Sequence, residues 1–169
     1  MEKGDLSYRI NGCAMTVHTQ LGRGFREYVY CRALAIELRQ AGIAFQREVW
    51  LPIYYGKYKI AARRADFVCD QKIMLELKAK TILDAADFAQ ALNTLNCLNV
   101  KEGLLLNFGA NALEYKHLFN SKYDPAKESL DITPELVGEP SDDIWQLRDY
   151  LPDWEIYKMQ LDKQKKKKE

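Results

Sequence analysis

The segment KIMLELKAK, residues 72 to 80, constrains the fold more than any other part of the chain. Its apolar residues are typical of a buried β-strand, yet it carries a carboxylate and an ammonium group two positions apart, Glu76 and Lys78. Because side chains alternate along a strand, Glu76 and Lys78 share one face and the neighbouring leucines share the other. One face of a buried strand is therefore charged, and that charge needs a chemical reason.

The length and composition predict one folded domain. A chain of 169 residues can bury one hydrophobic core, and 47% hydrophobic with 29% charged residues is usual for a globular protein. The four cysteines are widely spaced without a metal-ligand pattern, so we expect reduced thiols. The amino terminus is polar, and no run approaches the ~20 apolar residues that span a membrane. We expect a cytoplasmic protein with no membrane partner.

The net charge of +1 is unevenly distributed. Residues 163–169 hold five Lys and one Glu, so the preceding 162 residues sum to −3. A slightly acidic total gives no global support for nucleic-acid binding, and such a partner must be argued from a local site. The Lys-rich tail is predicted to be a solvated, disordered end or an anion-binding arm.

Helical periodicity predicts two helices at the start of the chain. The first begins after Asp5 and continues to Leu21, where the sequence GRG ends it. The second covers about 25–41 and stops at Gly42. Glu27 falls on the apolar stripe of this second helix, which predicts that its carboxylate faces inward.

Strands dominate the middle of the chain. Alternating and β-branched segments predict an antiparallel meander over residues 44–55, 58–60, 64–69 and 72–79. A helix is then expected over 84–98, packing through Phe88, Ala91, Leu92 and Leu95, followed by strands over 103–109 and 113–119.

The sequence changes character after residue 120. Three of the five prolines fall in the next twenty residues, and Trp145 and Trp154 lie in short helical patterns beyond them. The boundaries predicted here are a domain over 1–120, a partly helical extension over 121–162 and the tail. The tryptophans predict that the extension packs on the body or forms a homodimer.

Three acids and one lysine occupy positions where apolar residues are expected: Glu27, Asp66, Glu76 and Lys78. A buried carboxylate costs several kcal/mol unless it is paired, hydrogen-bonded or bound to a metal. A three-residue loop over 70–72 would set Asp66 opposite Glu76, whereas a two-residue loop would separate them.

Two adjacent carboxylates suit a hard divalent cation, Mg²⁺ or Mn²⁺. Such a cation can activate water and neutralise charge on a phosphoryl group, with a lysine beside it. The alternative is structural: Glu76 and Lys78 would form an ion pair on a solvated edge strand, with Asp66 beside Arg64.

These residues carry a resemblance to a known family. Gly24, Glu27 and Tyr30 have the spacing GxxExxY, and the segments RADFVCD, LELKAK and GLLLNFG follow in order. Over residues 8 to 120 the chain resembles the GxxExxY family of small prokaryotic proteins, within the PD-(D/E)XK nuclease-like superfamily. Arg23 stands where that family usually has proline.

The resemblance implies an α/β fold with a mixed sheet, the restriction-endonuclease-like core, flanked by helices. It implies that Asp66 and Glu76 hold a metal ion, that Lys78 is catalytic, and that Glu27 adds a further acid to the metal site. Gln90 resembles the polar residue supplied by the helix that follows.

Other side chains could assist. Arg63, Arg64 and Lys80 flank the acids and could contact phosphates or balance the carboxylates. His18 could support the site or serve structure alone, and three tyrosines near residue 56 could stack on bases or reflect strand propensity. The sequence thus predicts a Mg²⁺-dependent nuclease acting on DNA or RNA. A non-catalytic nucleic-acid-binding or protein-interaction module that retains the fold is the alternative.

Overall fold

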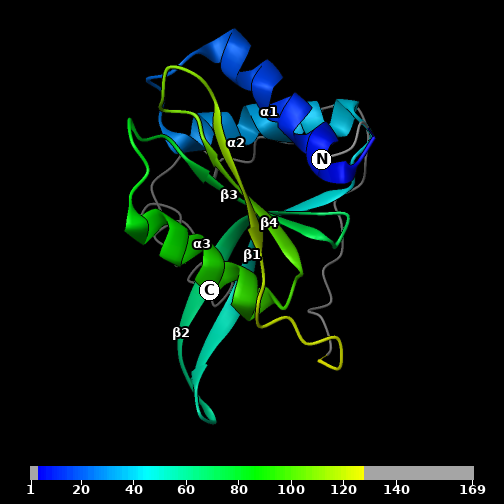
Figure 1. The fold of residues 1–169 in the computed structure, drawn as a ribbon, viewed down its shortest axis with the longest axis vertical. Helices are drawn as coiled ribbons and strands as arrows, with labels where there is room; N and C mark the ends of the chain where they lie inside the picture. The colour runs from blue at the N-terminus through cyan, green and yellow to red at the C-terminus, as the bar shows by residue number, and fades with distance from the viewer. Residues whose placement is uncertain (1–3, 128–169) are drawn as a thin grey trace, which may run out of the picture. The chain divides into compact units, whose positions relative to one another are not determined.

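The computed structural model describes residues 4–127, all within one compact unit. Three helices and five strands follow one another as α1 (Leu6–Leu21), α2 (Glu27–Gln40), β1 (Phe45–Tyr55), β2 (Tyr58–Cys69), β3 (Ile73–Lys78), α3 (Ala85–Leu98), β4 (Glu102–Asn107) and β5 (Glu114–Phe119) (Figure 1). Most of the predicted extension, the Lys-rich tail and the predicted homodimer contact lie outside the described residues.

The five strands form one mixed sheet in the order β1-β2-β3-β4-β5. The first three strands make the predicted antiparallel meander. β4 then pairs parallel to β3, because α3 carries the chain back across the sheet, and β5 closes the edge antiparallel to β4. A mixed sheet flanked by helices is the architecture that the family resemblance implies, and this prediction is confirmed.

Two hydrophobic cores sandwich this sheet. α1 and α2 lie together in Figure 1 and cover one face, where Tyr30 stacks on Phe108 with ring centroids 4.8 Å apart. α3 covers the other face, where Leu95 and Leu98 pack against Met74 and Leu105. The strands between these two cores are buried on both faces, which explains the unbroken apolar run in β4.

Two predicted details are wrong. The segments 58–60 and 64–69 form one strand, β2, which absorbs an irregularity in its pairing with β1 near Ile53. Leu92 is exposed, and Thr94 and Leu98 share the buried side of α3 with Ala91 and Leu95. Helical periodicity allowed either side for Leu92, and packing on the sheet decided between them.

The end of β4 fixes the segment that follows β3. The Asn107 side chain accepts hydrogen bonds from the Lys80 and Gly109 N–H groups and donates to the Lys80 carbonyl. A Cβ on Gly109 would lie 2.4 Å from the Lys80 nitrogen, so these two backbones approach too closely for any side chain. This contact fixes the chain just beyond Lys78.

Gly109→Ala is therefore expected to destabilise the fold by about 1–3 kcal/mol, since the backbone of 79–80 must move. Gly12→Ala is the matched control: it lies inside α1 with nothing within 4 Å of the added Cβ, and it should be neutral or stabilising by up to ~1 kcal/mol. Urea unfolding of both variants measures the difference. Equal stabilities of the two variants would show that the backbone of residues 79–80 can move without a cost in free energy.

Candidate active site

The β2–β3 hairpin sets the two acids opposite each other. Its turn contains three residues, Asp70 to Lys72, and Asp70 and Gln71 both adopt positive φ. The pairing Phe67↔Leu75 then places Asp66 and Glu76 at the next facing position. The structure thus has the longer of the two loops considered from the sequence, and the acids lie side by side.

Asp66 lies where β2 and β3 separate. Its Oδ2 accepts a hydrogen bond of 2.8 Å from the Leu77 N–H, so a side chain replaces a strand-to-strand backbone bond. The described pairing of these strands runs only from Cys69↔Ile73 to Phe67↔Leu75. The carboxylate therefore holds the strands at the point where they diverge.

Glu76 and Lys78 follow on β3. The Lys78 Nζ lies 3.7 Å from Glu76 Oε1 and donates a hydrogen bond of 3.2 Å to Gln90 Oε1 on α3. Both charged side chains are largely buried, at 12% exposure for Glu76 and 15% for Lys78. This degree of burial argues against the alternative of an ion pair on a solvated edge, and β3 is an interior strand of the sheet.

Glu27 approaches from the helix layer on the other face. It begins α2, and the turn before it is clamped by Tyr30, whose hydroxyl donates to the Gly22 carbonyl and accepts from the Phe25 N–H. Gly24 adopts a φ of 110° in this turn, which only glycine takes readily. The GxxExxY spacing thus builds a turn that presents Glu27 at the start of a helix.

Ion pairs on β1 and β2 lie beside the acidic cluster, which we define as Glu27, Asp66 and Glu76. Arg64 lies 4.0 Å from Asp66 and 3.3 Å from Glu48, and Glu48 has a φ of 53° within a strand. Non-glycine residues rarely adopt this conformation, and such strain often accompanies functional sites. Sequence reasoning missed Glu48, because a backbone angle leaves no mark in the residue pattern.

Ionisation of the three carboxyl groups in the cluster is disfavoured. Burial, followed by the charge of Asp66, raises the pKa of Glu76 to about 7. The same two causes raise the pKa of Glu27 to about 7, and burial raises the pKa of Asp66. Three carboxyl groups from two layers are therefore close enough to oppose one another's ionisation.

The donor atoms fit a hard divalent cation. Glu76 Oε2 is buried and has no hydrogen-bond partner among the residues described, which is unusual for a carboxylate oxygen. Oxygen ligands on neighbouring carboxylates are those that Mg²⁺ and Mn²⁺ prefer. The side chains of residues 4–127 nevertheless form no ready-made group of three ligands, so the fit rests on the chemistry of these donor atoms.

The other predicted residues divide into two groups. Gln90 contacts Lys78, and the charge of Arg63 offsets a small part of the rise in the pKa of Glu76 that burial causes. His18 instead lies with its Nε2 3.0 Å from the Ala110 carbonyl, and the Lys80 Nζ lies within 2.8 Å of the Asp84 and Asp87 carboxylates that begin α3. Any role of these two in binding nucleic acid stays a prediction.

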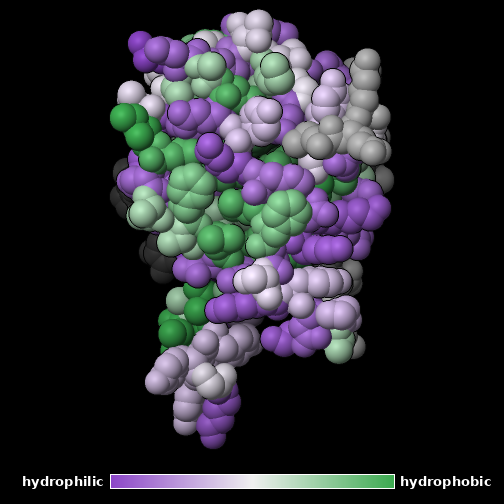
Figure 2. Space-filling view, in the orientation of Figure 1, coloured by the Kyte–Doolittle hydropathy of each residue, from purple (hydrophilic) through white to green (hydrophobic). Residues whose placement is uncertain are grey.

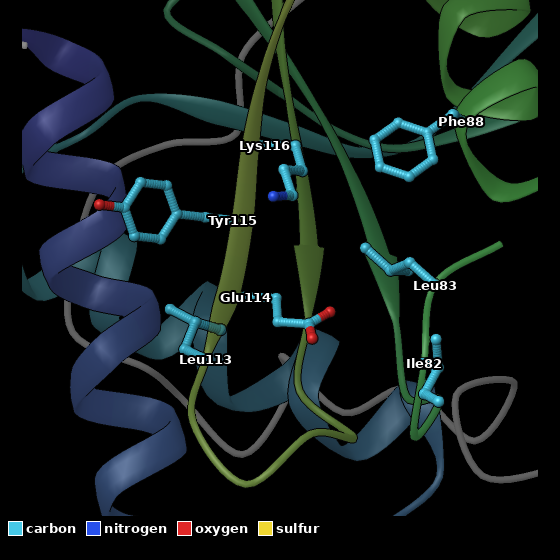
Figure 3. A pocket seen from close by; sticks show the side chains of 7 residues that line it. All are labelled: Ile82, Leu83, Phe88, Leu113, Glu114, Tyr115 and Lys116. Atoms are coloured by element: carbon cyan, nitrogen blue, oxygen red, sulfur yellow. The ribbon is translucent and has the colours of Figure 1, made fainter. Parts of the chain in front are cut away.

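A separate groove of ≈ 410 Å³ opens beside β5. Figure 3 shows Glu114 and Lys116 on the side of β5 that faces Leu83 and Phe88, with Tyr115 on the opposite side. Phe88 and Gln90 are two residues apart on α3 and point about 160° apart around the helix axis. The groove and the acidic cluster therefore lie on different flanks of the helix and share no lining residue.

Comparison with protein families identifies a matching family model. The family model described as the PD-(D/E)XK nuclease superfamily matches residues 4–118. Curated proteins and solved structures give no significant match. Within residues 4–127, every helix is too short or too polar to cross a membrane.

The raised pKa of Glu76 predicts a pH dependence of stability in the metal-free protein. The folded state holds the Glu76 proton up to about pH 7, whereas the ordinary value is 4.5. Stability is fully present below the lower value and falls as pH rises through the upper one. Between pH 5 and pH 8 in EDTA, the free energy of unfolding should fall by up to about 3 kcal/mol from this group.

Glu76→Gln removes the titrating group and should flatten this decline in urea unfolding experiments. Asp70→Asn neutralises an exposed carboxylate on the same hairpin and should leave the decline unchanged. If wild type and Glu76→Gln lose equal stability over this range, the Glu76 carboxyl group does not carry the effect.

Proposed function

This chain belongs to the PD-(D/E)XK nuclease superfamily, and from that premise we propose that it hydrolyses phosphodiester bonds in nucleic acid, with DNA the favoured substrate. We further propose that it falls within the GxxExxY family of that superfamily. One observation supports the activity above all others: Asp66, Glu76 and Lys78 converge where β2 and β3 separate. These three side chains, and not the family membership alone, support catalytic turnover.

Asp66 and Glu76 would hold Mg²⁺ or Mn²⁺, with Glu27 as a further acid. The buried, unpartnered Oε2 of Glu76 and the raised pKa values of all three acids favour this role. When bound, the cation supplies positive charge that stabilises a phosphoryl transition state and favours ionisation of a water molecule. Asp66 also keeps its hydrogen bond to Leu77, so one of its oxygens has a fixed position.

Lys78 would hold the attacking water. Its Nζ donates to Gln90 Oε1 and lies 3.7 Å from Glu76 Oε1, and an ammonium group has three donors, so at least one remains for a water or phosphate oxygen. The water oxygen forms a bond to phosphorus as the bond from phosphorus to the leaving oxygen breaks, and solvent takes up the proton that the water loses and supplies the proton that the leaving oxygen gains. Gln90 is a positioning residue in this scheme, since it acts through Lys78.

Arg63 and Arg64 would meet the phosphates of the bound strand. Arg64 is partly exposed and lies two residues before Asp66 on β2. Residues 4–127 carry seventeen Lys and Arg against twelve Asp and Glu, a net charge of +5. The acidic sum of the first 162 residues therefore comes from the part beyond residue 127, and the described part suits a polyanion.

Lys78→Ala, Asp66→Asn and Glu76→Ala should each lower Mg²⁺-dependent cleavage by at least ~100-fold, the usual size of a lost acid-base or electrostatic contribution. Lys72→Ala is the matched control, an exposed lysine on the same hairpin that should leave the rate unchanged. Cleavage of labelled single-stranded, double-stranded and branched substrates measures the rates, and circular dichroism checks folding.

Undiminished cleavage by a folded Lys78→Ala variant would refute the assignment of Lys78. Measurable binding without cleavage of any of these substrates in Mg²⁺ or Mn²⁺ would show that the chain is a binding module and not a nuclease.

A further inference from the structure

The β1–β2 hairpin extends past the body as a two-stranded ribbon (Figure 1). We define the arm as residues 50–65, the part of this hairpin from Trp50 to Ala65. Leu51 and Ala65 at its base are buried in the core beneath α3, whereas every residue from Tyr54 to Ala62 is exposed. The base is thus anchored, and the far end lacks a covering layer among the described residues.

Large apolar and aromatic side chains gather on this exposed ribbon. The exposed fractions are 66% for Trp50, 59% for Tyr54, 77% for Tyr55, 64% for Tyr58 and 64% for Ile60. Tyr55 and Tyr58 face each other across the turn at the tip, where Gly56 adopts a φ of 59°. The two tip rings therefore lie on one face of the ribbon.

The arm is also strongly basic. Its sixteen residues include Lys57, Lys59, Arg63 and Arg64 and no acid, a net charge of +4. Figure 2 shows the ribbon standing clear of the body in this view, with strongly hydrophilic side chains at its end. A surface that combines aromatic rings with positive charge complements a nucleic-acid strand, which has base faces and phosphates.

Strand propensity does not explain this composition by itself. A two-stranded ribbon is marginally stable in water unless something packs on a face, and exposed apolar area is unfavourable by about 25 cal/mol per Å². Thr, Lys or Glu would serve an unliganded ribbon as well. The large rings are better explained by a partner that covers them.

The arm leads directly to the acidic cluster. β2 runs without a break from Tyr58 at the tip to Asp66, a distance of ~25 Å for eight strand residues. Trp50 pairs with Arg64 across the ladder, and Arg64 lies 4.0 Å from Asp66. A strand of several nucleotides lying along the arm would reach the carboxylates.

We propose that the arm binds single-stranded nucleic acid, with unpaired bases stacked on Tyr55 and Tyr58 and phosphates held by Lys57 and Lys59. This inference rests on the proposed nuclease function and names its substrate class. In a duplex the base faces are already stacked on one another, so exposed rings gain nothing there. Unpaired bases offer a free face, worth about 1–3 kcal/mol for each ring.

Fluorescence anisotropy with the full chain in EDTA tests binding without requiring cleavage. The double variant Tyr55→Ser, Tyr58→Ser should weaken binding of a labelled single strand by at least ~10-fold and change duplex binding little. Tyr115→Ser, which removes an exposed tyrosine on β5, is the matched control and should bind as wild type. Lys57→Gln with Lys59→Gln should reduce the salt dependence of single-strand binding, because fewer counterions are released.

Unchanged single-strand affinity in a folded tyrosine double variant would overturn the proposal. Equal weakening for single strand and duplex would overturn the single-strand preference. A change of oligomeric state in the variant, or cross-links from the arm to the acidic residues 128–162 that oligonucleotide does not displace, would assign the arm to a protein segment instead. Single-strand binding by a protein that never cleaves would uphold the arm and refute the nuclease.

Discussion

The hydrogen bond from the Leu77 N–H to the Asp66 carboxylate is the contact on which the site depends. It satisfies a backbone donor that would otherwise be buried without a partner, at the position where two interior strands part. It also fixes the direction of a carboxylate that burial disfavours. A hydrophobic residue at position 66 would leave the backbone donor unsatisfied, so fold and chemistry require the same side chain.

Around that bond, charges from both layers of the sandwich meet in a small volume. Glu27 comes from α2 on one face, and Gln90 comes from α3 on the other. Arg64 and Lys78 offset part of the negative charge, yet the pKa values of the three acids stay raised because burial outweighs these partners. Ionisation of the acids is thus unfavourable in the metal-free site, as expected for carboxylates that would bind a cation.

Several elements could be predicted from sequence because local physics fixes them. The period of α1 and α2, the apolar run of β4 and the Gly-containing turns all determine local conformation without help from distant residues. Leu92 and the continuity of β2 could not be predicted, since each depends on what packs against the segment. Glu48 was missed for the same reason: its positive φ occurs where the pairing with β2 skips one residue, between Arg47 and Val49.

The sequence by itself determined the acids, the lysine and their strand, because charge inside an apolar run is costly unless it has a task. Only the tertiary structure decided that the hairpin loop has three residues, that Glu27 reaches the same cluster from a helix, and that Lys80 is held by Asp84 and Asp87. These outcomes depend on register and on packing between layers, and residues far apart in the chain set both.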